Sequence, residues 1–212
     1  MDEPERRFDP AQSSDPLAQQ VAWGPLYYGG ASYRTHYLKF TRPERARFVT
    51  ARRAQMLAFI VLFAGIGFTL GYLGATFTPS YFAEELGRTV VLLFGLLFVA
   101  GGAINLYMDN VPIVFDKSHG YFWKNRKRPK ELAETDQQAK YVKLDDIHAI
   151  QLLAEMLLSR RRWFRSYELN LVLTSGERVN VVDHSDLDGI RDDADQLAKF
   201  LGVPVWDVIE AV

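Results

Sequence analysis

The apolar residues of this chain are concentrated in its middle, and charged residues crowd both flanks. No residue from Ala54 to Ala83 is charged, and residues 56–77 are long enough to cross a hydrocarbon core of roughly 30 Å as a helix. A second uncharged stretch, residues 89–108, has a similar length. Both stretches are apolar on all sides, which is typical of helices inside a membrane. The pattern predicts a two-helix transmembrane hairpin over residues 54–108.

Basic residues flank the two predicted spans, whereas the loop between them carries Arg88 beside Glu84 and Glu85. Loops rich in Lys and Arg stay on the cytoplasmic side of a membrane. We therefore expect a multi-pass protein of the cytoplasmic (inner) membrane with both termini in the cytoplasm. The flanking basic residues are Lys39, Arg42, Arg45, Arg47, Arg52 and Arg53 before the first span and Lys117, Lys124, Arg126, Lys127 and Arg128 after the second.

Glycines are frequent in both spans, and small side chains let helix backbones approach closely in lipid. We expect them to pack the two helices together, and contact with a second copy of the chain is the alternative. Neither span contains an ionisable residue, whereas ion paths and proton relays usually place charge inside the membrane. The hairpin is therefore predicted to be an anchor. The glycines in question are Gly67, Gly71, Gly74, Gly101 and Gly102.

The region before the first span divides in two. Residues 1–22 are rich in charge, Pro, Ser and Gln, which predicts a disordered N-terminal tail. Residues 23–53 interleave aromatic and basic residues without one clean period. Up to Arg42 we expect strand or irregular structure, which either lies at the membrane surface or joins the C-terminal domain. From Pro43 onward a basic helix is expected to lead into the first span.

Short alternating segments follow the second span and predict strands. Residues 111–125 have apolar runs on either side of Ser118-His119-Gly120, a tight hairpin turn. Residues 141–156 alternate and then become apolar. Residues 167–183 alternate most clearly, with a turn at Ser175-Gly176. These segments predict an antiparallel β domain over residues 109–212.

One amphipathic helix is predicted after these strands. Ser185 and Asp188 resemble a capping box, and apolar residues keep helical spacing from Leu187 until Gly202 and Pro204 end the helix. A small sheet must have its open end covered, and a helix with one apolar stripe is suited to that task. The fold class is therefore membrane protein, α+β.

The strand order carries a family resemblance. The segments FDKSHGYFWKN, VKLDDIHAI and YELNLVLTSGERVNVVD, followed by the helix DLDGIRDDADQLAKFLG, resemble the pleckstrin-homology-like (PH-like) domains that bacterial membrane proteins often carry beside two transmembrane helices. The resemblance covers residues 111–207 and the hairpin, and it includes a local turn at Leu144, Asp146 and Ile147. It implies a small PH-like β-barrel or sandwich closed by the C-terminal helix.

The sequence offers no catalytic motif. There is no cysteine, and the four histidines, His36, His119, His148 and His184, lack the spacing of a zinc site. Asp183-His184-Ser185 contains the residue types of a hydrolytic triad, but adjacent side chains point in different directions. We expect no enzyme, no cofactor and no metal. The net charge of −1 also argues against nucleic acid as a partner.

Two basic clusters remain as candidate binding sites for anionic lipid or a protein partner. Near a membrane each such charge contributes about 1 kcal/mol to the attraction of anionic lipid, and solvated loops are the plain alternative. The first cluster is Lys124, Arg126, Lys127, Arg128 and Lys130. The second is Arg160, Arg161, Arg162, Trp163, Phe164 and Arg165, expected in the loop before the strand that starts at Ser166.

These observations favour a non-enzymatic, membrane-anchored PH-like module that binds a protein partner, anionic lipid or both at the cytoplasmic membrane face. The alternative is a regulatory or structural subunit of a membrane transport or envelope-stress assembly, acting through its transmembrane helices.

The predicted topology has a direct test. A reporter enzyme that is active only in the cytoplasm, fused after Val212, should be active, because the positive-inside rule keeps both flanks on that side. Activity of a reporter that works only outside the cytoplasm would contradict the topology.

Overall fold

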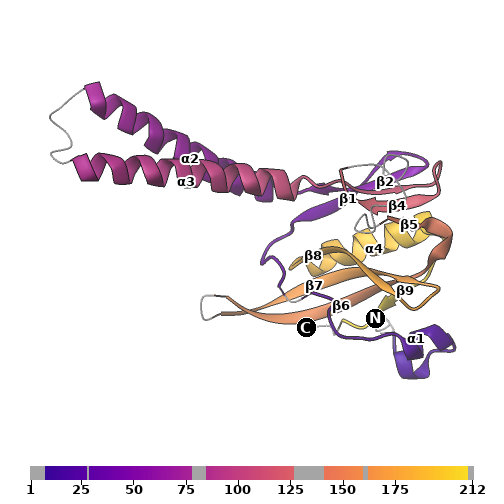
Figure 1. Cartoon of the computed structure of the whole chain (residues 1–212). Coiled ribbons are helices and arrows are strands. Elements are labelled where there is room, and N and C mark those ends of the chain that lie inside the picture. Colours follow the sequence, from indigo (N-terminus) through magenta and orange to yellow (C-terminus); the bar gives the residue numbers. More distant parts are fainter. Residues whose placement is uncertain (1–7, 28, 78–84, 127–140, 160–161, 210–212) are drawn as a thin grey trace, which may run out of the picture. The chain divides into compact units, whose positions relative to one another are not determined.

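The computed structural model describes residues 8–27, 29–77, 85–126, 141–159 and 162–209. The chain forms two compact units (Figure 1). Residues 1–49 and 112–212 make up one unit, called here the β domain, and residues 50–111 make up the other, called the helix pair. The β domain contains two sheets and a helix, so the α+β class is confirmed.

The first sheet contains five strands in the order β1-β2-β3-β4-β5. The pairs β2–β3, β3–β4 and β4–β5 are antiparallel. The predicted turn at Ser118-His119-Gly120 joins β3 to β4, and Gly120 has a φ of +74°, which glycine adopts without steric cost. The strands are β1 His36–Arg42, β2 Arg45–Thr50, β3 Ile113–Asp116, β4 Tyr121–Lys124 and β5 Tyr141–Lys143.

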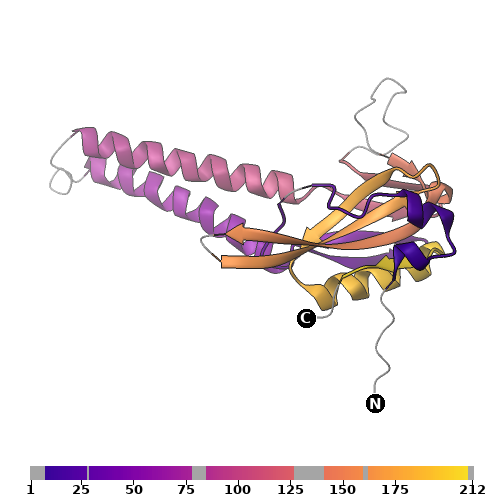
Figure 2. The ribbon, with the colours of Figure 1, turned by 90° about the horizontal axis from the view of Figure 1, so that it is seen from below.

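The second sheet has the order β8-β7-β6-β9, with β9 parallel to β6. The antiparallel β6–β7 hairpin is longer than its neighbours and extends beyond them (Figure 2). The predicted turn at Ser175-Gly176 joins β7 to β8, with Gly176 at a φ of +83°. The strands are β6 Ile147–Ser159, β7 Arg162–Leu173, β8 Arg178–His184 and β9 Val205–Asp207.

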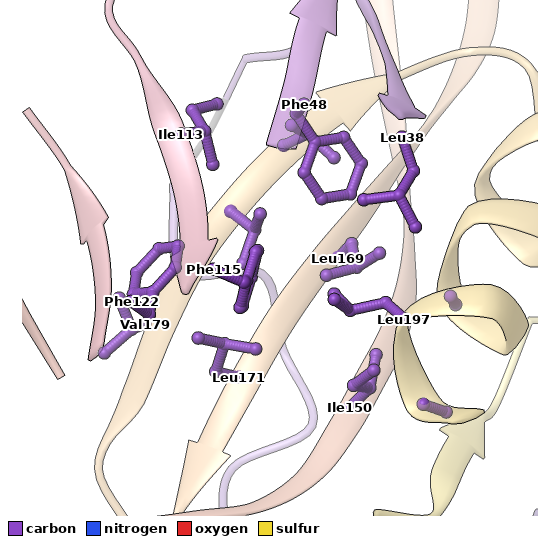
Figure 3. Close-up of a cluster of buried hydrophobic side chains, with 14 of the residues drawn as sticks. Leu38, Phe48, Ile113, Phe115, Phe122, Ile150, Leu169, Leu171, Val179 and Leu197 are labelled. Carbon is purple, nitrogen blue, oxygen red and sulfur yellow. The ribbon is translucent and has the colours of Figure 1, made fainter. Parts of the chain in front are cut away.

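The core of the β domain lies between the inner faces of the two sheets. Alternation along β7 places Leu169 and Leu171 inward, and Phe115 and Phe122 face them from the first sheet (Figure 3). These four side chains are fully buried. The alternating pattern of the sequence thus predicted the inward face of β7 correctly.

Helix α4, Leu187–Leu201, closes this core. Its apolar stripe includes the fully buried Ile190 and Leu197, and the helix packs against β1, β6, β7 and β9. The N-cap is Asp186, whose carboxylate accepts from Gly189 N at 3.1 Å, so the predicted capping by Ser185 is wrong. Gly202 ends the helix as predicted, with a φ of +81°.

The strands β1 and β2 show where the segment before the first span belongs. The segment before the first span joins the β domain as strands, since β2 pairs with β3 from Arg45↔Asp116 to Phe48↔Ile113. The basic helix expected from Pro43 onward is wrong, because β2 occupies Arg45–Thr50. The predicted β domain, residues 109–212, is incomplete because β1 and β2 also belong to it. The helix pair is an insertion between two paired strands.

The expected disorder of residues 1–22 is wrong for residues 8–22. The short helix α1, Pro16–Gln20, and the residues around it cover the outer face of the second sheet (Figure 1). Ala18 is fully buried there against a cluster that includes Trp206. The prediction of disorder from composition failed because a few apolar residues, spaced far apart in the sequence, each pack against that face. Residues 1–7 lie outside the described residues.

The helix pair consists of α2, Arg52–Phe77, and α3, Glu85–Asp109, packed against each other. Among the described residues, the segment Thr89–Met108 is long and apolar enough to cross a membrane. The apolar segment Ala58–Leu73 of α2 is shorter.

The glycines at the helix contact differ from most of those predicted. A Cβ on Gly65 would lie 2.5 Å from Val99 N, and one on Gly102 would lie 2.7 Å from the backbone of Leu62. Gly95 is equally crowded. Gly102 was therefore predicted correctly, whereas the space around Gly67, Gly71 and Gly101 is open, so their predicted role in packing α2 against α3 is wrong. The side chain environment of Gly74 lies outside the described residues.

The discontinuous β domain predicts how fragments will fold. Residues 109–212 alone should show no cooperative melting, because they lack β1, β2 and the buried Ala46 and Phe48. A chain in which a short Asn-Gly turn replaces residues 50–111 should melt cooperatively, since β2 and β3 are already antiparallel neighbours. Circular dichroism during heating measures both. A cooperative transition in the shorter fragment would contradict the assignment.

Candidate functional site

Several arginines lie on the outer face of the first sheet. Because Ala46 and Phe48 of β2 point into the core, the alternating residues Arg45 and Arg47 point outward. Val114 and Trp123 lie across the ladder from Arg47, at Arg47↔Val114 and Val114↔Trp123. Strand pairing therefore brings the arginines of β2, Val114 of β3 and Trp123 of β4 onto one face.

These side chains line a pocket of about 400 Å³. Its residues come from β1, β2, β3 and β4, and from Pro112 just before β3 and Arg126 just after β4. The lining residues are Thr41, Arg42, Arg45, Arg47, Pro112, Val114, Trp123 and Arg126. Trp123 is 4% exposed and forms part of the wall, with the Arg45 guanidinium 5.6 Å from its ring centroid.

Asp116 partly balances the charge of the pocket. Its carboxylate lies 3.6 Å from the Arg45 guanidinium and accepts a hydrogen bond from the Ser118 hydroxyl. Burial raises the pKa of Asp116, but hydrogen bonds from Ser118 and His119 outweigh burial and hold its pKa below the usual value. Four of the eight residues that line the pocket are arginines, so the lining is rich in cationic side chains.

The arrangement suits an anion with several oxygens. Guanidinium groups present planar pairs of donors that match phosphate and carboxylate. The lining residues offer no carboxylate, histidine or thiol for acid–base or nucleophilic chemistry, and the Thr41 hydroxyl donates to Arg45 O at 3.3 Å. The pocket is therefore equipped to bind.

The first predicted basic cluster divides in the structure. Arg126 lines the pocket. Lys124 instead turns to the second sheet, where its Nζ donates to Asn180 Oδ1 at 3.0 Å and Val181 O at 2.9 Å. The cluster members Lys127, Arg128 and Lys130 lie outside the described residues.

The second predicted cluster is strand rather than loop where the structure describes it. Arg162, Trp163, Phe164 and Arg165 belong to β7 and continue its ladder with β6, ending at Ser159↔Arg162. The prediction failed because a run of charged residues is typical of a turn. A strand that extends beyond its sheet exposes both faces to solvent, so it can carry charged residues as well. Arg160, Arg161 and the side chain of Arg162 lie outside the described residues.

Three of the pocket arginines were not among the predicted site residues. Arg42, Arg45 and Arg47 were interpreted as membrane-flanking charges alone. The alternation Arg45-Ala46-Arg47-Phe48 was the available signal, because it matches a strand with one polar and one apolar face.

A second polar cluster lies on the outer face of the second sheet, beneath the N-terminal segment. Glu168 is 4% exposed and accepts from Leu26 N through both carboxylate oxygens, at 3.0 and 3.1 Å. Asn180 Nδ2 donates to Asp183 Oδ1 at 2.8 Å. Burial, together with the charge of Glu168, raises the pKa of Asp183 to about 6, although the bond from Asn180 opposes this. The contact of Glu168 with the backbone of Leu26 indicates a structural role, which is to hold the N-terminal segment against the sheet.

Two of the predicted structural histidines, His148 and His184, lie in different environments. His148 Nε2 lies 2.6 Å from Asp15 Oδ2 and ties α1 to β6, and this hydrogen bond lowers the pKa of Asp15. Burial lowers the pKa of His184 to about 4, so its ring is neutral at pH 7. No group of three metal-ligating side chains occurs within the described residues.

Comparisons with models of protein families, with curated proteins and with solved structures found no match.

The buried carboxyl of Asp183 predicts a pH-dependent variant. Its pKa is about 6 in the folded chain and 3.8 without the fold, so the folded state favours the protonated form and loses that stability as pH rises through 6. Asp183→Asn should therefore stabilise the protein above pH 6, by at most about 3 kcal/mol before solvent screening. The gain should vanish near pH 4.

The measurement is urea unfolding of the β domain with the short turn in place of residues 50–111, compared with its Asp183→Asn variant from pH 4 to pH 8. A difference in unfolding free energy that stays constant over this range would contradict the assigned pKa.

Proposed function

We propose that this chain is a non-enzymatic, membrane-anchored module with a PH-like cytoplasmic domain, and that the domain binds the head groups of anionic lipid in the inner leaflet of the cytoplasmic membrane. The observation that carries the proposal is the arginine-lined pocket on the first sheet. A protein partner with a phosphate or carboxylate group has the same chemistry and remains the second occupant to test.

The exposed surface of the helix pair supports the anchor. Large apolar side chains are exposed on both helices, for example Phe63 at 63% and Leu97 at 66%. Leaving such a surface in water is unfavourable, at about 25 cal/mol for each Å². The polar groups of Thr69 and Asn105 bond to carbonyls one turn earlier, at 2.9 and 3.0 Å, as a helix in lipid requires.

The pairing of β2 with β3 supports two membrane crossings rather than one. The two strands are hydrogen-bonded neighbours and so lie on the same side of any membrane that the helix pair crosses. An odd number of crossings between Thr50 and Ile113 would separate them. With α3 as one span, α2 is the second. This argument does not depend on loop charges, and it agrees with the topology that those charges predict.

Chain connectivity supports a pocket close to the membrane surface. Residues 48–51 separate Arg47 from the first residue of α2, and Asn110 and Val111 separate α3 from Pro112. An extended chain rises at most about 3.6 Å per residue, so Arg47 lies within roughly 18 Å of the start of α2.

The PH-like assignment is supported by the arrangement of the β domain. Two sheets enclose one core, and a C-terminal amphipathic helix packs against strands of both sheets. This is the arrangement that the resemblance implies. The additional strand β9 and the N-terminal segment extend it.

The alternative, an assembly subunit that acts through its helices, has one observation in its favour. Gly67 and Gly71 have open space around them, so a neighbouring helix can approach their backbone closely.

Charge removal from the pocket tests the proposal. Arg42, Arg47 and Arg126 are changed together to Gln, whereas Arg45 is retained because its partner Asp116 is 2% exposed. Loss of three charges at about 1 kcal/mol each should weaken binding of a short-chain phosphatidylglycerol roughly 100-fold. The salt dependence should also become shallower. Isothermal titration of the full chain in neutral detergent measures both.

Two matched controls accompany this variant. Lys199→Gln removes a charge from α4, away from the pocket lining, and should leave binding unchanged. Gly67→Leu with Gly71→Leu should also leave lipid binding unchanged and would disturb assembly only under the alternative. Equal affinity of the triple variant and the original chain, or equal affinity for phosphatidylcholine, would contradict the proposal.

A further inference from the structure

The β6–β7 hairpin extends past the strands that flank it. Strand β8 pairs with β7 only as far as Tyr167↔His184, and β9 pairs with β6 over Ile150–Leu152. Residues 156–159 and 162–165 therefore pair with each other in a two-stranded extension (Figure 1). This extension is called here the β6–β7 arm.

One face of the arm is apolar and exposed. Leu158 pairs with Trp163, and Met156 pairs with Arg165 on the same face. The exposed fractions are 54% for Met156, 59% for Leu158 and 67% for Trp163. The alternation that points Ile150 and Leu152 into the core continues along β6 into the arm, where the core has ended.

The chemistry of this face matches the boundary between lipid tails and head groups. Trp is enriched at that depth because its ring is amphipathic. Arg165 pairs with Met156 on this face, and an arginine can lay its aliphatic stem along apolar surface while its head reaches phosphate. Its positive charge complements an anionic leaflet.

A second copy of the chain fits this face less well. Three side chains of roughly 200 Å² each, about 60% exposed, offer on the order of 400 Å². A standard protein interface takes about 800 Å² from each partner. Insertion into lipid needs no such minimum area, since each buried apolar side chain contributes separately.

We propose that the face of the β6–β7 arm formed by Met156, Leu158 and Trp163 inserts into the interfacial layer of the membrane that the helix pair crosses. This inference rests on the proposed membrane anchor. The anchor fixes the domain at one point and the arm adds a second contact, so the orientation of the pocket toward the lipid head groups becomes restricted.

The absence of cysteine from the sequence gives a direct test. A spin label is attached to the full chain through Leu158→Cys, and the protein is placed in vesicles that contain phosphatidylglycerol. The matched control is Ser175→Cys, which is also exposed and lies at the other end of β7, about 35 Å away along the strand. A third label at Phe63→Cys, on α2, reports the anchor itself.

Collision of each label with oxygen, which concentrates in lipid, is compared with collision with a water-soluble nickel complex. The ratio should be several-fold higher at position 158 than at position 175. A label at 158 as accessible to water as the label at 175, while position 63 lies in lipid, would overturn the arm inference and leave the anchor intact.

Two other outcomes also decide against the inference. An aqueous label at position 63 would remove the anchor and the arm inference together. Dipolar coupling between labels at position 158 that persists when the protein is diluted with lipid would assign the apolar face to a second copy of the chain.

Discussion

The hydrogen-bonded pairing of β2 with β3 is the constraint on which the other features depend. These strands are adjacent in the first sheet although residues 50–111 separate them in the sequence. Because of this pairing, the chain leaves the β domain at the end of β2 and returns to it at the start of β3, which are neighbouring positions in the sheet. It also aligns Arg47 with Val114 and Trp123, so the same register that closes the sheet forms the wall of the pocket.

The two faces of the first sheet divide structural and binding roles between neighbouring residues. Along β2 the residues alternate in the order Arg45, Ala46, Arg47, Phe48. Ala46 and Phe48 are buried in the core, and Arg45 and Arg47 line the pocket. A shift of one residue in the register of β2 would place the arginines in the core, at a cost far above that of an ordinary cavity. The apolar core therefore fixes the position of the charges. The buried Asp116 adds to this effect by holding one guanidinium beside Trp123.

The sequence was informative where a signal is local. The turns at Gly120 and Gly176 and the end of α4 at Gly202 each need a positive φ, and glycine identifies such positions. The candidate site needed more, because the pocket combines residues 41–47 with Trp123 and Arg126. The order of the strands in the sheet, with β2 and β4 on either side of β3, cannot be predicted from a single sequence. Arg126 was found as part of a basic run, and Arg42, Arg45 and Arg47 were given a different role because a membrane span follows them.

The helix contact shows a similar limit. Spacing alone identifies Gly67 and Gly71 as a small-residue pair, but it does not state which side of α2 meets α3. Gly65 and Gly95 occupy the contact, and the crowding around them shows that the backbones approach as closely as glycine allows. The rotation of each helix about its axis depends on all the side chains at the contact, and this information is not local.

The inserted helix pair also explains how two distant strands can pair. Closing a flexible loop of the length of residues 50–111 costs about 3 to 4 kcal/mol in chain entropy. When the two antiparallel helices pack, the start of α2 and the end of α3 lie roughly 8–10 Å from each other. Paired strands are about 4.8 Å apart. Once α2 and α3 have packed, most of this entropy has already been lost. The pairing of β2 with β3 then resembles the closing of an ordinary hairpin, and the pocket forms as a consequence of that step.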